Sequence, residues 1–452
     1  MEPPIPVDDE IAPPQQRPRA QTAPRLGGGG AANIFRALQN HGFRPYLVAL
    51  VASGLGLWMQ MFALGWLVVQ VATAEGRAQQ APFYLGLVGL ARAGPALLLG
   101  PFGGAFADRF PRRSILMVTQ AAAAGLALAL AALTVLGAVA LWPILLIAAA
   151  SSAAWAFDIP TRQSLVPSLV GGKDLMSAIG LTAAASNATQ ILGPVVAGVL
   201  LATTNAATLF VAISGSFLVC VILLRLVPQE ATATAPAQSV RASLIEGAGY
   251  MRANSSIRRV LAAELVIAFL AWPYVLLAPA IVQNDLHAGA TTLSLLLAAT
   301  GVGALIGSLV VASFGALADG ARLLVGLQAL VGAALIVFGT QSALVGVVAG
   351  GLLIGATLIS FEGLANGLLQ SNTPNELRGR VLSARSLILT GVMPLGQLAL
   401  GSSATLRGST QQILLGGGVV VMILALAAFV RTVLMPGAGS HQRRDRGMTI
   451  EP

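Results

Sequence analysis

Charged side chains inside long apolar segments are the residues of this chain best placed to do chemistry. Arg92 lies roughly 14 Å into the segment 83–106, at 1.5 Å per helical residue. An arginine at the centre of a membrane helix costs about 2.5–3.5 kcal/mol on insertion scales, so it faces a cavity or a partner rather than lipid. Glu362 lies in the segment 343–368, which holds no basic residue. Apolar surroundings disfavour the charged form of a carboxylate, which suits Glu362 to bind and release protons.

Each of these residues also has a simpler interpretation. Arg92 could extend to the outer membrane surface or form a fixed ion pair, and it could equally bind an anionic substrate group or a carboxylate in a cavity. Glu362 could be a neutral, hydrogen-bonded structural residue near the interface. The sequence leaves these alternatives open.

Two further acids are weaker candidates for transport chemistry. Asp158 precedes Arg162 by four residues, the spacing of a local ion pair on a helix, although a proline between them disturbs helical geometry. We expect this pair to be a salt bridge, with a place on the proton pathway as the alternative. Glu264 lies near Arg258 and Arg259, which predicts an interfacial ion pair.

The sequence holds no grouping of residues that is typical of metal, redox or ATP chemistry. The histidines His41, His287 and His441 are far apart, and Cys220 is the one cysteine. Lys173 is the one lysine, and no Gly-x-x-x-x-Gly-Lys-Ser/Thr motif occurs. We therefore expect no metal, no cofactor and no enzymatic activity, with the proton gradient as the energy source.

Apolar segments must position these residues, because 56% of the 452 residues are hydrophobic and 10% are charged. Soluble domains carry roughly 25% charged residues, and about 20 apolar residues span a bilayer as a helix. Twelve such segments are predicted. Their approximate bounds are 45–72, 83–106, 114–137, 140–160, 175–203, 207–228, 260–284, 290–314, 322–341, 343–368, 381–405 and 411–435. The prediction is an all-α membrane protein.

The longest internal polar stretch divides the chain into six segments plus six. Its opening ATATAPAQS has the composition of a linker. The predicted parts are a disordered N-terminal tail (1–42), a six-helix bundle (43–228), a central loop (229–259), a second six-helix bundle (260–435) and a C-terminal tail (436–452).

Arginines in the short loops set the expected orientation. With the N-terminal tail inside, the outer loops hold only Arg77 and Arg407, and all other loop arginines are inside. Both termini, the central loop and the loops holding Arg162 and Lys173 are then cytoplasmic. The net charge of +9 is a topology signal, and we expect no nucleic-acid partner.

The two halves of the sequence echo each other. GAFAD at 104–108 is matched by GALAD at 315–319, and FDIPTRQSLVP at 157–167 by FEGLANGLLQSNTP at 361–374. Parallel repeats of this kind predict two bundles related by a pseudo-two-fold axis along the membrane normal.

These motifs resemble the major facilitator superfamily. GAFADRFPRR at 104–113 is similar to the superfamily's loop 2–3 signature, with Pro111 where glycine is usual. ILGPVVAG at 191–198 resembles the segment-5 signature of drug/proton antiporters, with Ala197 in place of one glycine. GLGLWMQMFALGWLV (54–68), DIPTRQSLVPSLV (158–170) and QSNTPNELRGRVLSARSLILTGVMPLG (370–396) resemble the enterobactin-exporter-like branch.

The resemblance implies a cytoplasmic gate and two helix bends. The gate would hold the inward side closed in one state; plain positive-inside anchoring is the alternative for its charges. The expected gate residues are Gly104, Asp108, Arg109, Arg112, Arg113, Asp319 and Arg322. The expected bends are at Gly193, Pro194, Pro394 and Gly396, where proline removes a backbone hydrogen bond.

Polar and aromatic residues near segment midpoints are candidates for the substrate surface or for hydrogen bonds between helices. They are Trp58, Gln60, Asn187, Gln190, Trp272 and Gln397. Together with the resemblance, they predict a monomeric transporter in the bacterial inner membrane that exports a small organic molecule by proton antiport. Siderophores and drug-like compounds are the expected substrates. Proton-coupled uptake and a non-transporting sensor or scaffold are the alternatives.

Overall fold

The computed structural model describes residues 35–228, 249–313 and 320–434, and contains helices but no strand in those ranges. Eleven helical stretches there are long and apolar enough to cross a membrane, judged by length and composition. The predicted all-α membrane class is therefore confirmed.

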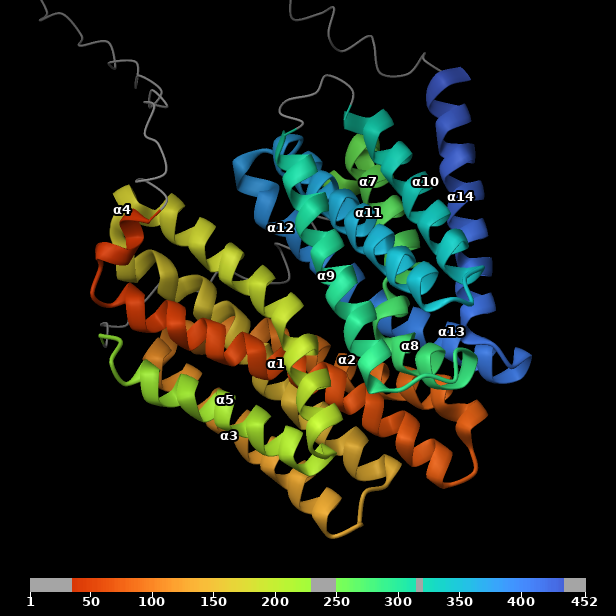
Figure 1. The fold of residues 1–452 in the computed structure, drawn as a ribbon. Helices are drawn as coiled ribbons and strands as arrows, with labels where there is room; N and C mark the ends of the chain where they lie inside the picture. The colour runs from red at the N-terminus through yellow and green to blue at the C-terminus, as the bar shows by residue number, and fades with distance from the viewer. Residues whose placement is uncertain (1–34, 229–248, 314–319, 435–452) are drawn as a thin grey trace, which may run out of the picture.

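The first helix group, here called the N bundle, contains five helices (Figure 1). They are α1 (Phe43–Ala74), α2 (Ala81–Arg109), α3 (Arg112–Val135), α4 (Leu141–Thr203) and α5 (Ala206–Leu224).

Helix α4 crosses the bundle twice. Its 63 residues would measure about 95 Å as a straight helix, three times the hydrocarbon thickness of a bilayer. Its backbone leaves helical geometry at Gly171, where φ is +68°, a conformation that glycine adopts without steric cost. Ser151 and Gly193, on either side of this break, both lie against the middle of α1. With α4 counted twice, the eleven stretches give the twelve crossings expected from the sequence.

The second group, here called the C bundle, contains eight named helices and two π-helical turns within the described residues. They are α7 (Ser255–Leu270), α8 (Pro273–Ala280), a π-helical turn (Ile281–Asp285), α9 (Ala290–Ser313), α10 (Gly320–Gly339), α11 (Leu344–Ser371), α12 (Asn375–Leu387), a π-helical turn (Ile388–Val392), α13 (Met393–Arg407) and α14 (Thr410–Leu434). Helices α8 and α13 each carry a proline in their first turn, Pro273 and Pro394. Because proline lacks an N–H, each of these crossings is built from two helical pieces.

Two of the expected boundaries are wrong. The tail was expected to reach residue 42, but Arg36–Gln39 form a short 3-10 helix, and Arg36 pairs with Asp174 of α4 at 3.0 Å. The central loop was expected to end at residue 259, but α7 begins at Ser255. The side chain of Asn254 accepts hydrogen bonds from the backbone N–H groups of the first turn of α7, which fixes its start.

Among the described residues, the contacts between the two bundles lie mainly toward one end of the molecule (Figure 1). We call the end where α1 begins, at Phe43, the near end, and the end where α1 finishes, at Ala74, the far end. Contacts between bundles join α2 with α13, the second leg of α4 with α9, and α1 and α2 with α8. These contacts reach the middle of α2, where Leu97 lies against Gly391, although Gly94 and Gly100 have open space beside them. Beyond this point, toward the near end, the bundles separate (Figure 1).

Candidate functional site

Hydrogen bonds close the far end of the seam between the bundles. Gln283 Nε2 donates to Thr73 Oγ1 at 3.0 Å, and Asn284 Nδ2 donates to the carbonyl oxygen of Ala78 at 2.7 Å. On α9, Ser294 Oγ donates to the carbonyl oxygen of Pro194 at 2.9 Å. Each of these bonds joins the N bundle to the C bundle.

Glycines allow α2 and α13 to approach closely along the same seam. A Cβ atom added to Gly401 would lie 2.2 Å from the carbonyl oxygen of Pro82, and one added to Gly86 would lie 2.7 Å from the Cα of Leu398. Both contacts are with backbone atoms, so no side-chain rotation would make room. The far end is therefore tightly sealed in this state.

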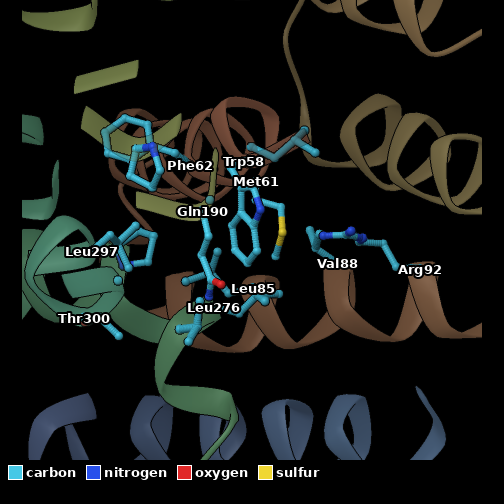
Figure 2. Close-up of a pocket in the computed structure, with 16 residues that line it drawn as sticks. Trp58, Met61, Phe62, Leu85, Val88, Arg92, Gln190, Leu276, Leu297 and Thr300 are labelled. Atoms are coloured by element: carbon cyan, nitrogen blue, oxygen red, sulfur yellow. The ribbon is translucent and has the colours of Figure 1, made fainter. Parts of the chain in front are cut away.

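A cavity lies on the near side of these contacts, at the centre of the seam. Figure 2 shows Trp58 and Met61 of α1, Arg92 of α2 and Gln190 of the second leg of α4 around it. Helices α8 and α9 of the C bundle complete the lining, for example with Leu297. Both bundles thus contribute walls to one cavity, as a site that is exposed alternately to two sides requires.

Arg92 supplies the charge of this cavity. Its guanidinium extends from α2 toward Met61 (Figure 2), and no carboxylate pairs with it among the described residues. A cation without a protein counter-ion in an apolar surrounding favours an anionic ligand group. Of the interpretations that the sequence leaves open, the fixed ion pair is not found within the described part of the chain.

Gln60 and Arg92 also line a smaller adjoining cavity, together with Ser151 and Trp155 of α4. The Gln60 side chain is buried, and its Nε2 donates to Ser151 Oγ at 3.4 Å. The structure therefore brings together Trp58, Gln60, Arg92 and Gln190 from the sequence-derived candidates.

A second polar centre lies inside the C bundle and is built around Arg385 of α12. The guanidinium of Arg385 donates through Nε to Glu264 Oε1 at 2.7 Å and through Nη2 to Glu362 Oε2. Trp272 Nε1 donates to the other oxygen of Glu362 at 2.8 Å. Glu264 is fully buried, and its Oε2 atom has no hydrogen-bond partner within the described residues.

This cluster corrects one expectation and adds one residue. Glu264 was expected to pair with Arg258 or Arg259, but it faces Arg385, because its side chain points inward from α7 while both arginines are exposed. Arg385 was not among the residues expected from the sequence. The available signal was its position as the one basic residue inside the predicted segment 381–405.

Asp158 lies in a separate buried network of the N bundle. Arg162 Nε donates to Asp158 Oδ2, while Thr119 Oγ1 and Gln120 Nε2 donate to Oδ1 at 2.9 and 2.8 Å. Asp158 is 0% and Arg162 8% exposed. Arg162, which was expected in a cytoplasmic loop, is thus a buried helical residue, because α4 stays helical through Pro160 and places the two side chains one turn apart.

We expect Asp158→Asn to destabilise the folded protein by about 3–5 kcal/mol, because it leaves Arg162 as an uncompensated buried charge. Chemical unfolding in mild detergent measures the loss. Asp174→Asn is the matched control: it breaks the pair with the half-exposed Arg36 and should cost less than about 1 kcal/mol. Equal losses in the two variants would contradict the assignment, and a double variant, Asp158→Leu with Arg162→Leu, should recover most of the stability.

Asn187 and Gln397 do not line the seam cavity. Asn187 is exposed on the second leg of α4, toward the near end. Gln397 of α13 is 1% exposed and lies against Gly89 of α2, and neither of its amide atoms has a hydrogen-bond partner among the described residues. It belongs to the closed seam.

The expected gate residues lie at the near ends of the two bundles or outside the described part of the chain. Arg113 Nη1 donates to the carbonyl oxygen of Val227 at 3.0 Å, and Arg109 is exposed. Arg112 is in the first turn of α3, and Arg322 is exposed in α10. Gly104 and Asp108 lie in α2, but their side-chain surroundings, like the whole of Asp319, lie outside what the structure describes.

The expected bends differ in local structure. Gly193 and Pro194 are buried in α4, whose one non-helical residue is Gly171. Pro394 is the second residue of α13, which directly follows the π-helical turn Ile388–Val392. A Cβ atom at Gly396 would lie 2.1 Å from the carbonyl oxygen of Phe269, so this glycine allows α13 to pack against α7.

Comparison of the sequence with known proteins gives consistent relatives. A family model described as transmembrane secretion effector matches residues 32–447. The staphyloferrin A transporter of Staphylococcus aureus is 24% identical over 396 residues, covering 84% of this chain and 94% of the relative. The macrolide efflux protein A of Streptococcus pyogenes is 23% identical over 348 residues, covering 75% and 85%.

Solved structures share the fold. A bacterial homologue of the iron transporter ferroportin, in an inward-facing state, aligns with a TM-score of 0.62 at 20% identity, over 89% of this chain and 99% of that one. A bacterial homologue of the human lysosomal transporter Spinster, inward-facing and unoccupied, aligns with a TM-score of 0.64 at 15% identity, over 85% and 96%.

Proposed function

Because the chain belongs to the transmembrane secretion effector family of the major facilitator superfamily, we propose that this membrane transporter exports a small organic molecule in exchange for protons. The molecule binds in the seam cavity, and the two bundles rock to expose it first to one side of the membrane and then to the other.

The observation that carries this proposal is the cavity shared by both bundles, sealed at the far end and holding Arg92, which pairs with no carboxylate among the described residues. In this state it encloses about 50 Å³, whereas sites for small organic molecules measure about 300–1,000 Å³. Substrate binding therefore requires the bundles to move apart around it. An amphipathic molecule with an anionic group fits a lining in which Trp58, Met61 and Phe62 surround one cation.

The cluster of Glu264, Glu362 and Arg385 is the proposed site for the coupled proton. With both carboxylates ionised the three side chains carry a formal charge of −1, and one added proton makes them neutral. A buried site of low dielectric constant favours the neutral arrangement. The proton can bind to Oε2 of Glu264, which has no hydrogen-bond partner among the described residues. Both oxygens of Glu362 already accept hydrogen bonds and are less suited to take it.

The proposed orientation places the near end in the cytoplasm, following the arginines in the near-end loops. The protein is then open toward the cytoplasm in this state, within the bacterial inner membrane, and acts as a monomer. Among the relatives, one is named for staphyloferrin A and another for macrolide efflux, so siderophores and drug-like compounds are the substrate classes to test first.

A susceptibility screen of a deletion strain supplies candidate substrates, and proteoliposomes containing the pure protein then test the mechanism. We expect an imposed proton gradient to drive the substrate in the direction opposite to the protons. Glu264→Gln combined with Glu362→Gln should remove this coupling while substrate still moves down its own gradient.

Arg92→Ala should slow transport of anionic substrates at least about tenfold, which corresponds to a loss of about 1.4 kcal/mol of binding free energy. Arg407→Ala is the control, because it removes an exposed far-end arginine, and it should leave transport unchanged.

The outcomes separate the alternatives. Substrate and protons moving in the same direction would show an uptake symporter, and a pure protein without any flux of the candidate compounds would indicate a sensor or scaffold. Unchanged coupling in the double glutamine variant would overturn the assignment of the proton site.

A further inference from the structure

A groove in the C bundle lies apart from the seam cavity and from the Arg385 cluster. It has a volume of about 730 Å³ and runs between α7, α10, α11 and α14. Its inner walls are apolar and include Leu324, Val325 and Leu424. The proposed transport mechanism uses none of its residues.

The mouth of the groove is polar and basic. Ser256 and Arg259 of α7 and Ser371 and Asn372 at the end of α11 line it. The Arg259 guanidinium donates weakly to the Ser255 carbonyl and to Ser256 Oγ, at 3.3 and 3.5 Å. Arg259 is exposed, and no acidic side chain is among the described residues that line the groove.

A buried amide faces the interior of the same groove. Gln328 of α10 is 4% exposed and lines the groove, and its side chain makes no hydrogen bond to the described part of the protein. Its amide atoms are not among the fully buried side-chain atoms without a partner, so they reach the open space of the groove. A ligand with a hydrogen-bonding group at this depth would meet an amide that no described protein group engages.

The position of the groove relative to the membrane indicates which ligand fits. Ser256, Gly320 and Ser371 lie within a residue of the near-end termini of three crossings, so the mouth is at the membrane–water interface. Gln328 lies two turns below the start of α10, and Arg259 lies one turn below the start of α7. If both helices start at one level, the Gln328 amide is about 6 Å deeper in the membrane than Arg259. A phospholipid has a matching arrangement, because its glycerol ester groups lie a few ångströms deeper in the membrane than its phosphate.

We infer that this groove binds one anionic phospholipid from the near-end leaflet. The phosphate lies at Arg259 and the polar mouth, an ester oxygen accepts a hydrogen bond from the Gln328 amide, and an acyl chain lies along the apolar wall. A bilayer presents such molecules at the level of the mouth, and the absence of acidic lining residues in the described structure favours a negative headgroup.

The test is native mass spectrometry of the full-length protein, delipidated in detergent and titrated with phosphatidylglycerol. We expect one molecule to be retained by the wild type and retention to fall at least fivefold in Arg259→Gln and in Gln328→Leu. Phosphatidylcholine, with a neutral headgroup of similar bulk, should be retained at least fivefold less than phosphatidylglycerol. Arg258→Gln is the matched control, because Arg258 is the neighbouring exposed arginine and does not line the groove.

Three results would overturn the inference. Equal loss in Arg258→Gln and Arg259→Gln would show attraction to general surface charge. Equal retention of the two lipids would remove the role of the anionic headgroup. Displacement of the lipid by glycerol phosphate alone would identify a site for a free phosphate group rather than for a lipid. Unfolding midpoints of each lipid-free variant establish that retention is compared between folded proteins.

Discussion

Replacing Arg385 with leucine should lower the free energy of unfolding by about 3–5 kcal/mol, the cost of leaving buried charge unpaired. Arg385 is the partner of both Glu264 and Glu362, so the substitution leaves two carboxylates facing each other without their cation. Each proton added to the pair removes one uncompensated charge. The deficit should therefore be largest at high pH and should shrink as the pH falls.

Unfolding of the purified protein by denaturant in mild detergent measures this loss. Arg407→Leu is the control, since it removes an exposed arginine from the end of α13 and should leave stability almost unchanged. Arg385→Lys keeps the charge but loses the geometry that serves two carboxylates at once, so an intermediate loss is expected. The triple variant Arg385→Leu, Glu264→Gln and Glu362→Gln should recover at least half of the deficit; no recovery would show that the arginine acts by packing alone.

Replacing Gly86 with valine should destabilise the state in which the far end of the seam is sealed. The added side chain would meet the backbone of Leu398, which cannot yield without separating α2 from α13. Gly401→Val, which meets the carbonyl oxygen of Pro82 from the other side of the seam, should have the same effect. We expect a shift of at least about tenfold toward states in which the far end is open, equivalent to 1.4 kcal/mol.

Thiol labelling from the far-end side of the membrane reports this shift. Leu297→Cys places a thiol in the seam cavity, and the native Cys220 is buried, so background labelling should be low. A membrane-impermeant maleimide should label the cavity thiol at least about tenfold faster when Gly86→Val is added. Gly94→Val is the matched control, because Gly94 is on the same helix with open space beside it. Equal rates in both variants would mean that the seam is not the barrier to labelling.

Apolar length and repetition predicted the fold because membrane helices must satisfy all their backbone hydrogen bonds internally. The same rule does not distinguish a loop from a helix that continues past prolines. Pro160 and Pro167 read as a break between two segments, whereas α4 continues to a reversal at Gly171. Arg162 therefore seemed to be a loop residue, although it is buried beside Asp158.

The seam cavity was partly predictable, because the cost of an arginine in a membrane indicates on its own that Arg92 faces an interior space. The cluster in the C bundle was not. Glu264 and Arg385 are 121 residues apart, and only the packing of α7 against the crossing formed by α12 and α13 brings them together. Arg385 also follows Arg378 and Arg380, so the three resemble one basic stretch at a membrane surface.

The unpaired amide of Gln397 has a consequence for the speed of the cycle. Its cost, about 1–3 kcal/mol, falls on the sealed state alone, because water reaches the amide once α2 and α13 separate. Raising the energy of the sealed state lowers the barrier for leaving it, so in the proposed cycle the far end should open faster than a fully satisfied interface would permit. An apolar residue of similar size at this position should make the sealed state more stable and, in the proposed cycle, slower to open.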